Sequence, residues 1–365
     1  MINVSFFPSR QLAWYVVRLF VTRSLAVLLA LILILMTLDL LGEAGKILAV
    51  PGNTDADLWR YVGLRVPILV SRFLPFSVLL GTLIAFVGLN QSSEVVAMKA
   101  AGLSAHQILA PLIVASIVIA AALFAFNEGV VVNSTRVVNA WTDNGYKPVP
   151  RASGILGNVW VLNGDDLIRA GIVGGRPFVA QDVTIYDREG GMLHRVIRAA
   201  KAVPDPKSGA WQLQSVRLYD ADMNVVRRLP AMTAMEGVTT NQLTLARVDP
   251  TQLDYWTLRE RTRELEAGGR PVDEARAGLA HKISGPLSTL LMPLLAAIAA
   301  FGLARSGQVL VRAVIGMALG FAYFVADNFS LAMGGAGTYP PVVAAWAPFF
   351  LFLLIGETVL IRTEE

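Results

Sequence analysis

Six long apolar runs lie along the chain, three before and three after a more polar middle part. Each run has close to the roughly 20 residues that an α-helix needs to cross a lipid bilayer. They cover residues 25–41, 66–89, 108–126, 283–303, 310–331 and 340–361. The pattern predicts an α-helical membrane protein with six transmembrane helices. The first run lacks a convincing cleavage site and more spans follow it, so we interpret it as an uncleaved span rather than a signal peptide.

The middle part, from Glu128 to about Asp249, changes to short alternating segments of the kind that form β-strands. Clusters of Gly, Asn, Asp and Pro separate these segments and are typical of turns. The expected strands are 157–162, 166–172, 182–186, 195–203, 211–219 and 224–229. They predict one inserted antiparallel all-β domain, a sandwich or an open roll. A polar connector over 249–280 follows, so the expected parts are residues 1–127, 128–280 and 281–365.

A short segment between the second and third runs, residues 92–104, predicts a helix at the membrane surface. Ser92 or Ser93 is expected to cap its N-terminus, and Glu94 in the first turn suits the helix dipole. Gly102 is placed to end the helix in a left-handed conformation. Its apolar side consists of Val95, Val96, Met98 and Leu103. An ordinary interfacial helix and a peg that docks into a soluble partner are both compatible with this pattern.

Composition and charge support a membrane protein and indicate its orientation. The 365 residues are 55% hydrophobic and only 16% charged, against about 25% charged in soluble domains. The net charge of +4 comes from basic residues scattered beside the apolar runs, which favours membrane topology over nucleic-acid binding. Those expected on the cytoplasmic side are Arg10, Arg18, Arg23, Lys99, Arg305, Arg312 and Arg362. Both termini are then cytoplasmic and the β-domain lies in the opposite compartment.

Motifs for chemistry within the chain are scarce. The sequence has no cysteine, its three histidines are far apart, and it has neither a phosphate-binding loop nor a hydrolase motif. Asp327 is the one acidic residue well inside an expected span. An interhelical hydrogen bond and a proton relay are both open for it. We therefore expect a non-catalytic chain without a cofactor or metal of its own, whose energy enters from elsewhere.

The order of spans and domain, together with three motifs, resembles the lipopolysaccharide-export permeases, the YjgP/YjgQ or LptF/LptG family. One motif is the segment from Ser93 to Met98 with Gly102, and another is Ser284-x-Pro286-Leu287-Ser288. The third is the series Gly302, Arg305, Arg312, Gly316, Gly320, Tyr323 and Asp327. The resemblance covers the whole length. Residues 183–186, 198–213 and 321–327 are more similar to the LptG branch of the family.

The resemblance implies a permease subunit of an ATP-driven ABC exporter in the bacterial inner membrane. The implied partners are a paralogous LptF-like permease forming a heterodimer, a cytoplasmic ATPase dimer that binds ATP and magnesium, and a periplasmic jellyroll bridge protein. The implied cargo is lipopolysaccharide or a similar anionic glycolipid, and the β-domain would be a jellyroll. Ser93, Glu94, Val95, Met98 and Gly102 would meet the ATPase. A non-transporting relay between an ATPase and a periplasmic partner is the alternative.

An amphiphilic cargo needs a lateral gate with an apolar wall and cations at its outer rim. The first span offers an apolar wall that includes Leu31, Leu35 and Leu38. Lys46 and Arg65 follow, and we expect them to hold anionic head groups. LptG-type proteins can carry lysines at the outer end of this span, whereas this chain has Asp39 and Glu43 there. This departure leaves the charge pattern of the cargo open.

Overall fold

The structure is a computed structural model that describes residues 8–147, 156–174, 178–190, 192–205, 209–221, 223–240, 243, 248–267, 271–301 and 309–364. The chain forms two compact units. The first contains Met1–Leu38, Val66–Val131 and Asp254–Glu365, and is helical. The second contains Asp39–Arg65 and Val132–Leu253, and holds the β-sheet. The expected domain limits at 127/128 and 280/281 stay a prediction.

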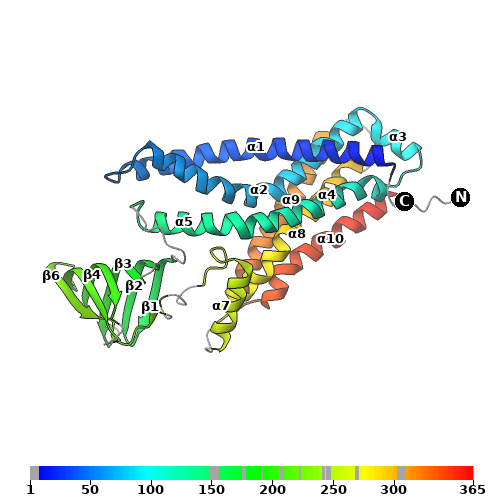
Figure 1. The fold of residues 1–365 in the computed structure, drawn as a ribbon. Helices are drawn as coiled ribbons and strands as arrows, with labels where there is room; N and C mark the ends of the chain where they lie inside the picture. Colours follow the sequence, from blue (N-terminus) through cyan, green and yellow to red (C-terminus); the bar gives the residue numbers. More distant parts are fainter. Residues whose placement is uncertain are drawn as a thin grey trace. The chain divides into compact units, whose positions relative to one another are not determined.

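The apolar runs form helices, and most of these helices extend beyond the runs (Figure 1). Their bounds are α1 Arg10–Leu48, α2 Asp55–Gln91, α3 Glu94–Ala100, α4 Ala105–Phe126, α7 Tyr255–Ala267, α8 Asp273–Phe301, α9 Val309–Gly335 and α10 Pro341–Glu364. The stretch between the first two apolar runs, residues 42–65, is therefore mostly helical, because both flanking helices continue into it. Gly52 lies in the turn between these helices, with a φ of 96°.

Five helices in the described part are long and apolar enough to cross a membrane. They are Arg10–Leu48, Asp55–Gln91, Ala105–Asp143, Val314–Gly335 and Pro341–Arg362. The fourth expected span lies on α8 and continues past Phe301 into residues outside the described part. The coarse prediction of a multi-span helical protein is confirmed, and the count of six spans stays a prediction.

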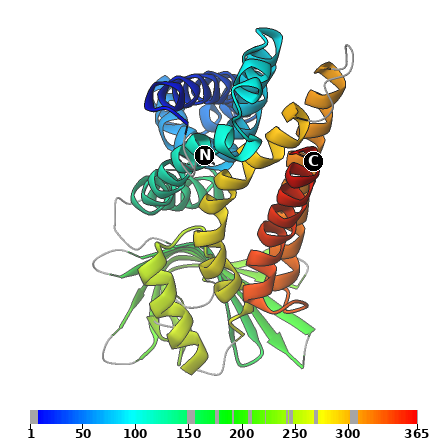
Figure 2. The same ribbon diagram turned by 90° about the vertical axis from the view of Figure 1, so that its right-hand side faces the viewer.

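The helical unit packs around one apolar cluster to which α1, α2, α3, α4, α8, α9 and α10 contribute. Figure 2 shows α8, α9 and α10 side by side. Small residues allow close helix contacts, since an added Cβ at Gly334 would lie 2.3 Å from the Cβ of Ala344. Large apolar side chains also cover the outward faces, where Leu29 and Leu33 of α1 are each 60% exposed. Such an outward face is typical of contact with lipid or another apolar surface.

One part of the expected β-region is helical. The π-helical turn η1 (Asn127–Val131) continues α4 into α5 (Val132–Asp143), so the prediction of β-structure from Glu128 is wrong at its start. Val138 and Trp141, three positions apart, are 4% and 1% exposed on one side of α5. This spacing is helical rather than alternating, and it explains the difference.

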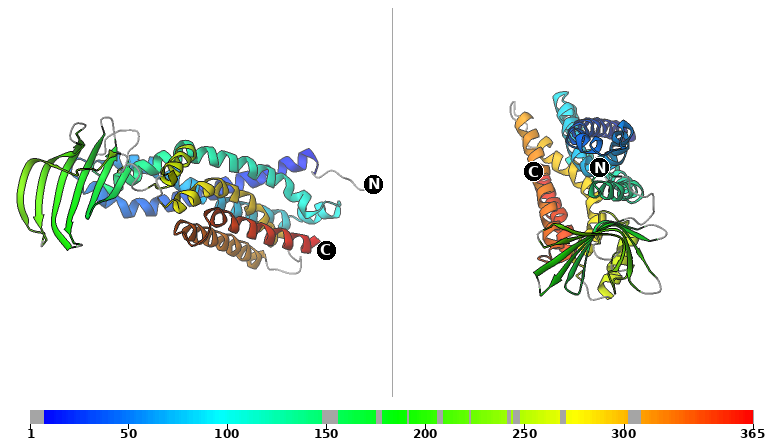
Figure 3. Two further views of the ribbon diagram at one scale, coloured as in Figure 1. Left: turned by 90° about the horizontal axis from the view of Figure 1, so that it is seen from below. Right: turned by 90° about the vertical axis from the view of Figure 1, so that its left-hand side faces the viewer.

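All six expected strands are present, and they form a single antiparallel sheet in the order β1-β2-β3-β4-β5-β6. The sheet is strongly curved (Figure 3). One face buries an apolar cluster that includes Val183, Leu213 and Trp211, whose Nε1 donates to Val238 O at 2.7 Å. A jellyroll has two sheets with Greek-key connections, so the jellyroll is not confirmed by the described strands. Their bounds are β1 Leu156–Asn163, β2 Asp166–Gly174, β3 Val179–Glu189, β4 Met192–Pro204, β5 Trp211–Asp220 and β6 Val225–Ala234.

Candidate coupling segment and gate

The segment expected to meet a partner folds as the short helix α3, which is fastened to the helical core. Val95 and Met98 are 4% and 7% exposed and belong to the same apolar cluster as Leu89 and Ile108. Gly102 has a φ of 85°, and the N–H of Leu103 donates to Met98 O at 3.1 Å. The left-handed helix end predicted at Gly102 is confirmed.

The start of α3 differs from the prediction. Ser93 occupies the N-cap position with a φ of 60°, and its side chain makes no capping hydrogen bond. Ser92 Oγ instead donates to Gly88 O at 3.1 Å and to Glu94 Oε1 at 2.8 Å. The hydroxyl of Tyr15 on α1 donates to the same Glu94 oxygen at 3.3 Å. Ser93 thus occupies the expected cap position, but no serine side chain caps the helix, because the Ser92 hydroxyl is taken by the Gly88 carbonyl and the Glu94 carboxylate.

The five residues expected to meet an ATPase therefore divide into two groups. Val95 and Met98 point into the core and anchor α3, so in this structure they offer no surface to a partner. Ser93 and Gly102 are exposed, and Glu94 is partly exposed. Val96, which the sequence did not single out for contact, is 59% exposed. The segment is therefore a short helix held by two buried side chains, with Glu94 partly exposed on its surface.

The start of α4 fixes the other end of this segment. Ser104 and Gln107 form a reciprocal capping box, with Ser104 Oγ accepting from Gln107 N at 3.2 Å. His106 Nε2 lies 3.2 Å from Glu357 Oε2 on α10. Polar contacts thus connect α3 to α1 through Glu94 and Tyr15, and the start of α4 to α10 through His106 and Glu357.

The expected apolar wall lies along one side of α1. Leu38 is 64% exposed, and Leu31 and Leu35 are partly exposed at the border of the buried face. Large apolar side chains that are more than half exposed continue along the apolar run of the helix. They are Leu25, Leu29, Leu33, Ile34, Leu38 and Leu41.

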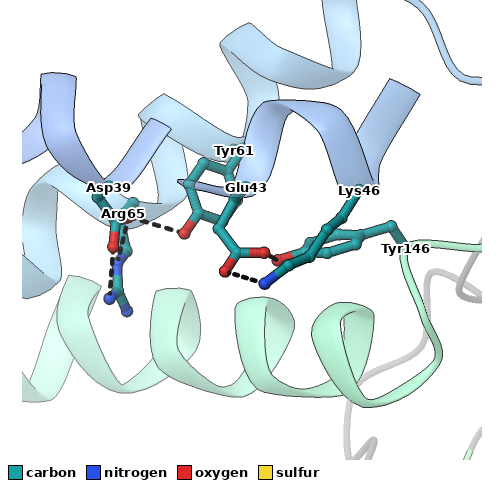
Figure 4. Close-up of polar contacts among 6 residues, drawn as sticks. All are labelled: Asp39, Glu43, Lys46, Tyr61, Arg65 and Tyr146. Carbon is teal, nitrogen blue, oxygen red and sulfur yellow. Dashed lines mark hydrogen bonds and ion pairs between the residues drawn. The ribbon is translucent and has the colours of Figure 1, made fainter. Parts of the chain in front are cut away.

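Polar side chains at the ends of α1, α2 and α5 form the outer polar cluster, defined as Asp39, Glu43, Lys46, Tyr61, Arg65 and Tyr146 (Figure 4). Arg65 donates to both oxygens of Asp39, from Nε at 2.9 Å and from Nη2 at 3.0 Å. The hydroxyl of Tyr61 also donates to Asp39, at 2.7 Å. Such a bidentate, charge-assisted pair fixes the geometry of both side chains.

The second carboxylate of the outer polar cluster is satisfied in the same way. Lys46 Nζ donates to Glu43 Oε1 at 2.8 Å, and the Tyr146 hydroxyl donates to Glu43 Oε2 at 2.6 Å. Burial, together with this hydrogen bond to a carboxylate, raises the pKa of Tyr146 to about 12. The neutral phenol is therefore the form that the folded protein holds.

The two cations expected to receive a head group are thus both paired within the protein. Arg65 is 29% exposed and tied to Asp39, whereas Lys46 is 65% exposed and keeps most of its surface. Two carboxylates and two cations make the outer polar cluster neutral. Asp39 and Glu43, the acidic residues that stand where LptG-type proteins can carry lysines, are the partners of Arg65 and Lys46. Their spacing in the sequence did not show this pairing.

Asp327 has a partner on the neighbouring helix. His281 Nε2 on α8 lies 3.0 Å from Asp327 Oδ2 on α9, and the aspartate side chain is 14% exposed. A Cβ at Gly285 would lie 3.1 Å from the His281 ring, so this glycine leaves room for it. The contact is an interhelical hydrogen bond, and a His–Asp pair of this kind is also compatible with a proton relay.

Sequence reasoning missed one further, partly buried pair, Lys282 with Glu128. Lys282 directly precedes the fourth apolar run and Glu128 nearly follows the third, so opposite charges at the ends of two neighbouring runs were the available signal. Arg305 and Gly302 lie outside the described residues, as does the side chain of Arg312. No group of three His, Asp or Glu suited to a metal ion occurs in the described ranges.

These features define a polytopic membrane protein that has a core-anchored surface helix and an inserted β-sheet. Residues 14–362 match the family described as Lipopolysaccharide export system permease LptF/LptG, so the chain belongs to this family of permeases. A permease is a transporter rather than a catalytic enzyme.

Similarity to individual proteins points to the LptG branch. The permease protein LptG of Escherichia coli strain K12 is 27% identical over 354 residues, which cover 93% of this chain and 94% of that protein. LptG of Haemophilus influenzae is 24% identical over 324 residues, covering 86% and 89%. The resemblance to the family, and to its LptG branch, is confirmed.

Proposed function

We propose that this chain is the LptG-type permease subunit of an ATP-driven exporter. In this proposal it pairs with an LptF-like permease and with a cytoplasmic ATPase dimer that binds ATP and magnesium. The complex extracts lipopolysaccharide, or a similar anionic glycolipid, from the inner membrane and passes it to a periplasmic jellyroll bridge protein. The family match over nearly the whole chain is the observation that carries the proposal.

The structure of α3 supports a coupling role toward the ATPase. A force on its surface acts on Val95 and Met98, which are seated in the apolar core, and on Tyr15 through Glu94. Because cores are close-packed, a displacement there is transmitted rather than absorbed. The partly exposed carboxylate of Glu94 suits a cation on the ATPase surface.

The proposed gate lies along α1. The exposed apolar side chains that include Leu38 provide an apolar surface for acyl chains. Lys46, exposed beside Glu43, is the cation more open to a phosphate group, and Arg65 binds one only by exchanging it for Asp39. The neutral outer polar cluster thus makes head-group binding a competition between lipid phosphates and internal carboxylates.

The proposed orientation has six spans, cytoplasmic termini and a periplasmic β-sheet, in the inner membrane. Short positive segments next to apolar helices lie on the cytoplasmic side by the positive-inside rule. Both termini share a side when the span count is even, and the sheet, inserted after the third span, then faces the other side.

Glu94→Lys tests the coupling proposal in a reconstituted complex with the paralogous permease and the ATPase. We expect loss of ATPase copurification and of ATP-dependent lipid extraction, since a cation would face a cation. Glu94→Gln should retain part of both, and Glu260→Lys, the same charge change on exposed α7, should behave as wild type. Normal copurification and extraction by Glu94→Lys would refute the coupling role.

The same preparation separates transport from the relay alternative. Photo-crosslinkers at Leu35 and Leu38 should capture the glycolipid, and Lys46→Glu with Arg65→Glu should reduce the adduct. A wild-type complex that hydrolyses ATP and engages the bridge, yet yields no lipid adduct and extracts no lipid, would support the relay instead.

A further inference from the structure

The chain crosses between its two units at four places, and one carboxylate joins the last two of them. It leaves the helical unit after Val131 and returns at Asp254. Glu128 lies in η1, three residues before the exit. Its Oε2 accepts the backbone N–H of Tyr255, the first residue of α7, and its Oε1 accepts Lys282 Nζ of α8 at 2.7 Å. Both connections and α8 therefore meet at Glu128.

Burial separates this contact from an ordinary surface ion pair. The side chains of Lys282 and Glu128 are 12% and 18% exposed, and both carboxylate oxygens of Glu128 have a donor. For comparison, the exposed pair between Arg276 and Glu266, which also joins α7 to α8, has side chains that are 47% and 52% exposed. Removing one partner of a covered pair leaves an uncompensated charge, whereas exposed pairs contribute little.

Residues from several helices of the helical unit meet next to Glu128. Asn127, beside Glu128, accepts a hydrogen bond from Ser71 Oγ of α2 at 2.6 Å. Phe124 at the end of α4 packs edge-on against the Tyr255 ring, with centroids 6.4 Å apart. The hydrogen-bond pattern is π-helical here, a rare form that is frequent at functional positions.

We infer that Glu128 is a positioning residue that transmits movement of α8 to the two connections that flank the strands of the sheet, after Val131 and before Asp254, through Lys282 on one oxygen and the Tyr255 N–H on the other. A shift of α8 moves Lys282, Lys282 moves the Glu128 carboxylate, and this carboxylate belongs to the outgoing connection while holding the returning one. This inference rests on the proposed function, because it assigns the contact to the handover of lipid from the helical unit to the sheet unit.

The test uses the full complex in vesicles, with ATP hydrolysis, lipid extraction and lipid transfer to the bridge protein measured separately. For Glu128→Ala and Lys282→Met we expect hydrolysis and copurification within about twofold of wild type and transfer at least tenfold lower. Glu128→Gln keeps an acceptor for Tyr255 N–H and should be intermediate. Glu266→Gln, at the exposed pair, is the matched control and should transfer normally.

A double variant with swapped charges and a hydrogen-exchange measurement distinguish a transmitting role of Glu128 from a purely structural one. Glu128→Lys combined with Lys282→Glu restores opposite charges but offers no acceptor to Tyr255 N–H, so transfer should recover only in part. Hydrogen exchange of the peptide containing Tyr255 should respond to ATP in wild type and lose that response in Glu128→Ala. A merely structural contact would not connect this amide to ATP.

Two results would overturn the inference: transfer at the wild-type rate in Glu128→Ala, or failure of Glu128→Gln to assemble, which would make Glu128 a folding residue. A wild-type complex that extracts no lipid refutes the proposed function instead. Failure of the inference and failure of the proposed function are therefore distinguishable in one experiment.

Discussion

Replacing Asp39 by Asn in the outer polar cluster tests whether Arg65 is held by an internal ion pair. The change keeps the shape of the side chain and removes the charge that receives two N–H groups from Arg65 and the hydroxyl of Tyr61. Exposed pairs contribute about 0.2–1 kcal/mol, and breaking a fully buried one costs about 3–5 kcal/mol. With the side chains of Arg65 and Asp39 29% and 22% exposed, we expect an intermediate coupling of about 2 kcal/mol.

A double-mutant cycle measures this coupling, with Asp39→Asn, Arg65→Gln and the double variant unfolded reversibly in mixed detergent. About 2 kcal/mol corresponds to roughly a 30-fold change in the unfolding equilibrium. The pair between Lys46 and Glu43 is the internal control. Because Lys46 is 65% exposed, its cycle with Lys46→Gln and Glu43→Gln should give less than about 1 kcal/mol.

The result that refutes this reasoning is a coupling for Asp39 with Arg65 below about 0.5 kcal/mol, since the pair would then behave as a solvated one. Asp39→Asn also releases the Arg65 cation. We therefore expect the glycolipid adduct of a crosslinker at Leu38 to increase, and a decrease would contradict the competition between lipid phosphate and carboxylate.

Three further outcomes are expected. Because the chain has no cysteine, Ala101→Cys should react with an impermeant maleimide only after permeabilisation and Gln214→Cys in intact spheroplasts; the opposite pattern would invert the topology. Because the pKa of Tyr146 is raised to about 12, its neutral phenol contributes stability that is complete below a pH of about 10 and is lost as the pH rises through 12. Ultraviolet titration of the wild type against Tyr146→Phe measures this pKa, and titration at the ordinary phenol pKa would contradict the expectation. Ser104→Ala removes the capping box and should lower the unfolding free energy by about 0.5–2 kcal/mol, unlike Ser93→Ala, whose side chain caps nothing.

Hydrophobic pattern predicted the helices and strands well because both depend on local periodicity. The alternation around Val183 and Leu213 identified two buried strands of the sheet. Helix ends were predicted less well, because they depend on contacts distant in sequence. The end of α1 continues past the apolar run because Asp39 and Glu43 have partners on α2 and after α5.

The candidate site divides in the same way between features with a local sequence pattern and contacts between residues distant in sequence. Glu94 and Gly102 are recognisable from local pattern, since one begins and the other follows a short helix. Pairing of Glu128 with Lys282 joins residues 154 positions apart, and no local pattern encodes such a contact. Strand order was likewise open, because six strands of this kind fit a sandwich, a roll or a single sheet.

The consecutive order of the sheet has a consequence for the biogenesis of the protein. Each strand pairs with the next one along the chain, so every pairing closes a short stretch of sequence and the contact order of the sheet is low. Low contact order favours rapid folding, and domains fold as units during synthesis, starting from the N-terminal end. We therefore expect the sheet to form while α8 is still being synthesised. The Glu128 carboxylate receives Lys282 only afterwards, so its contacts close late in assembly, after the sheet has formed.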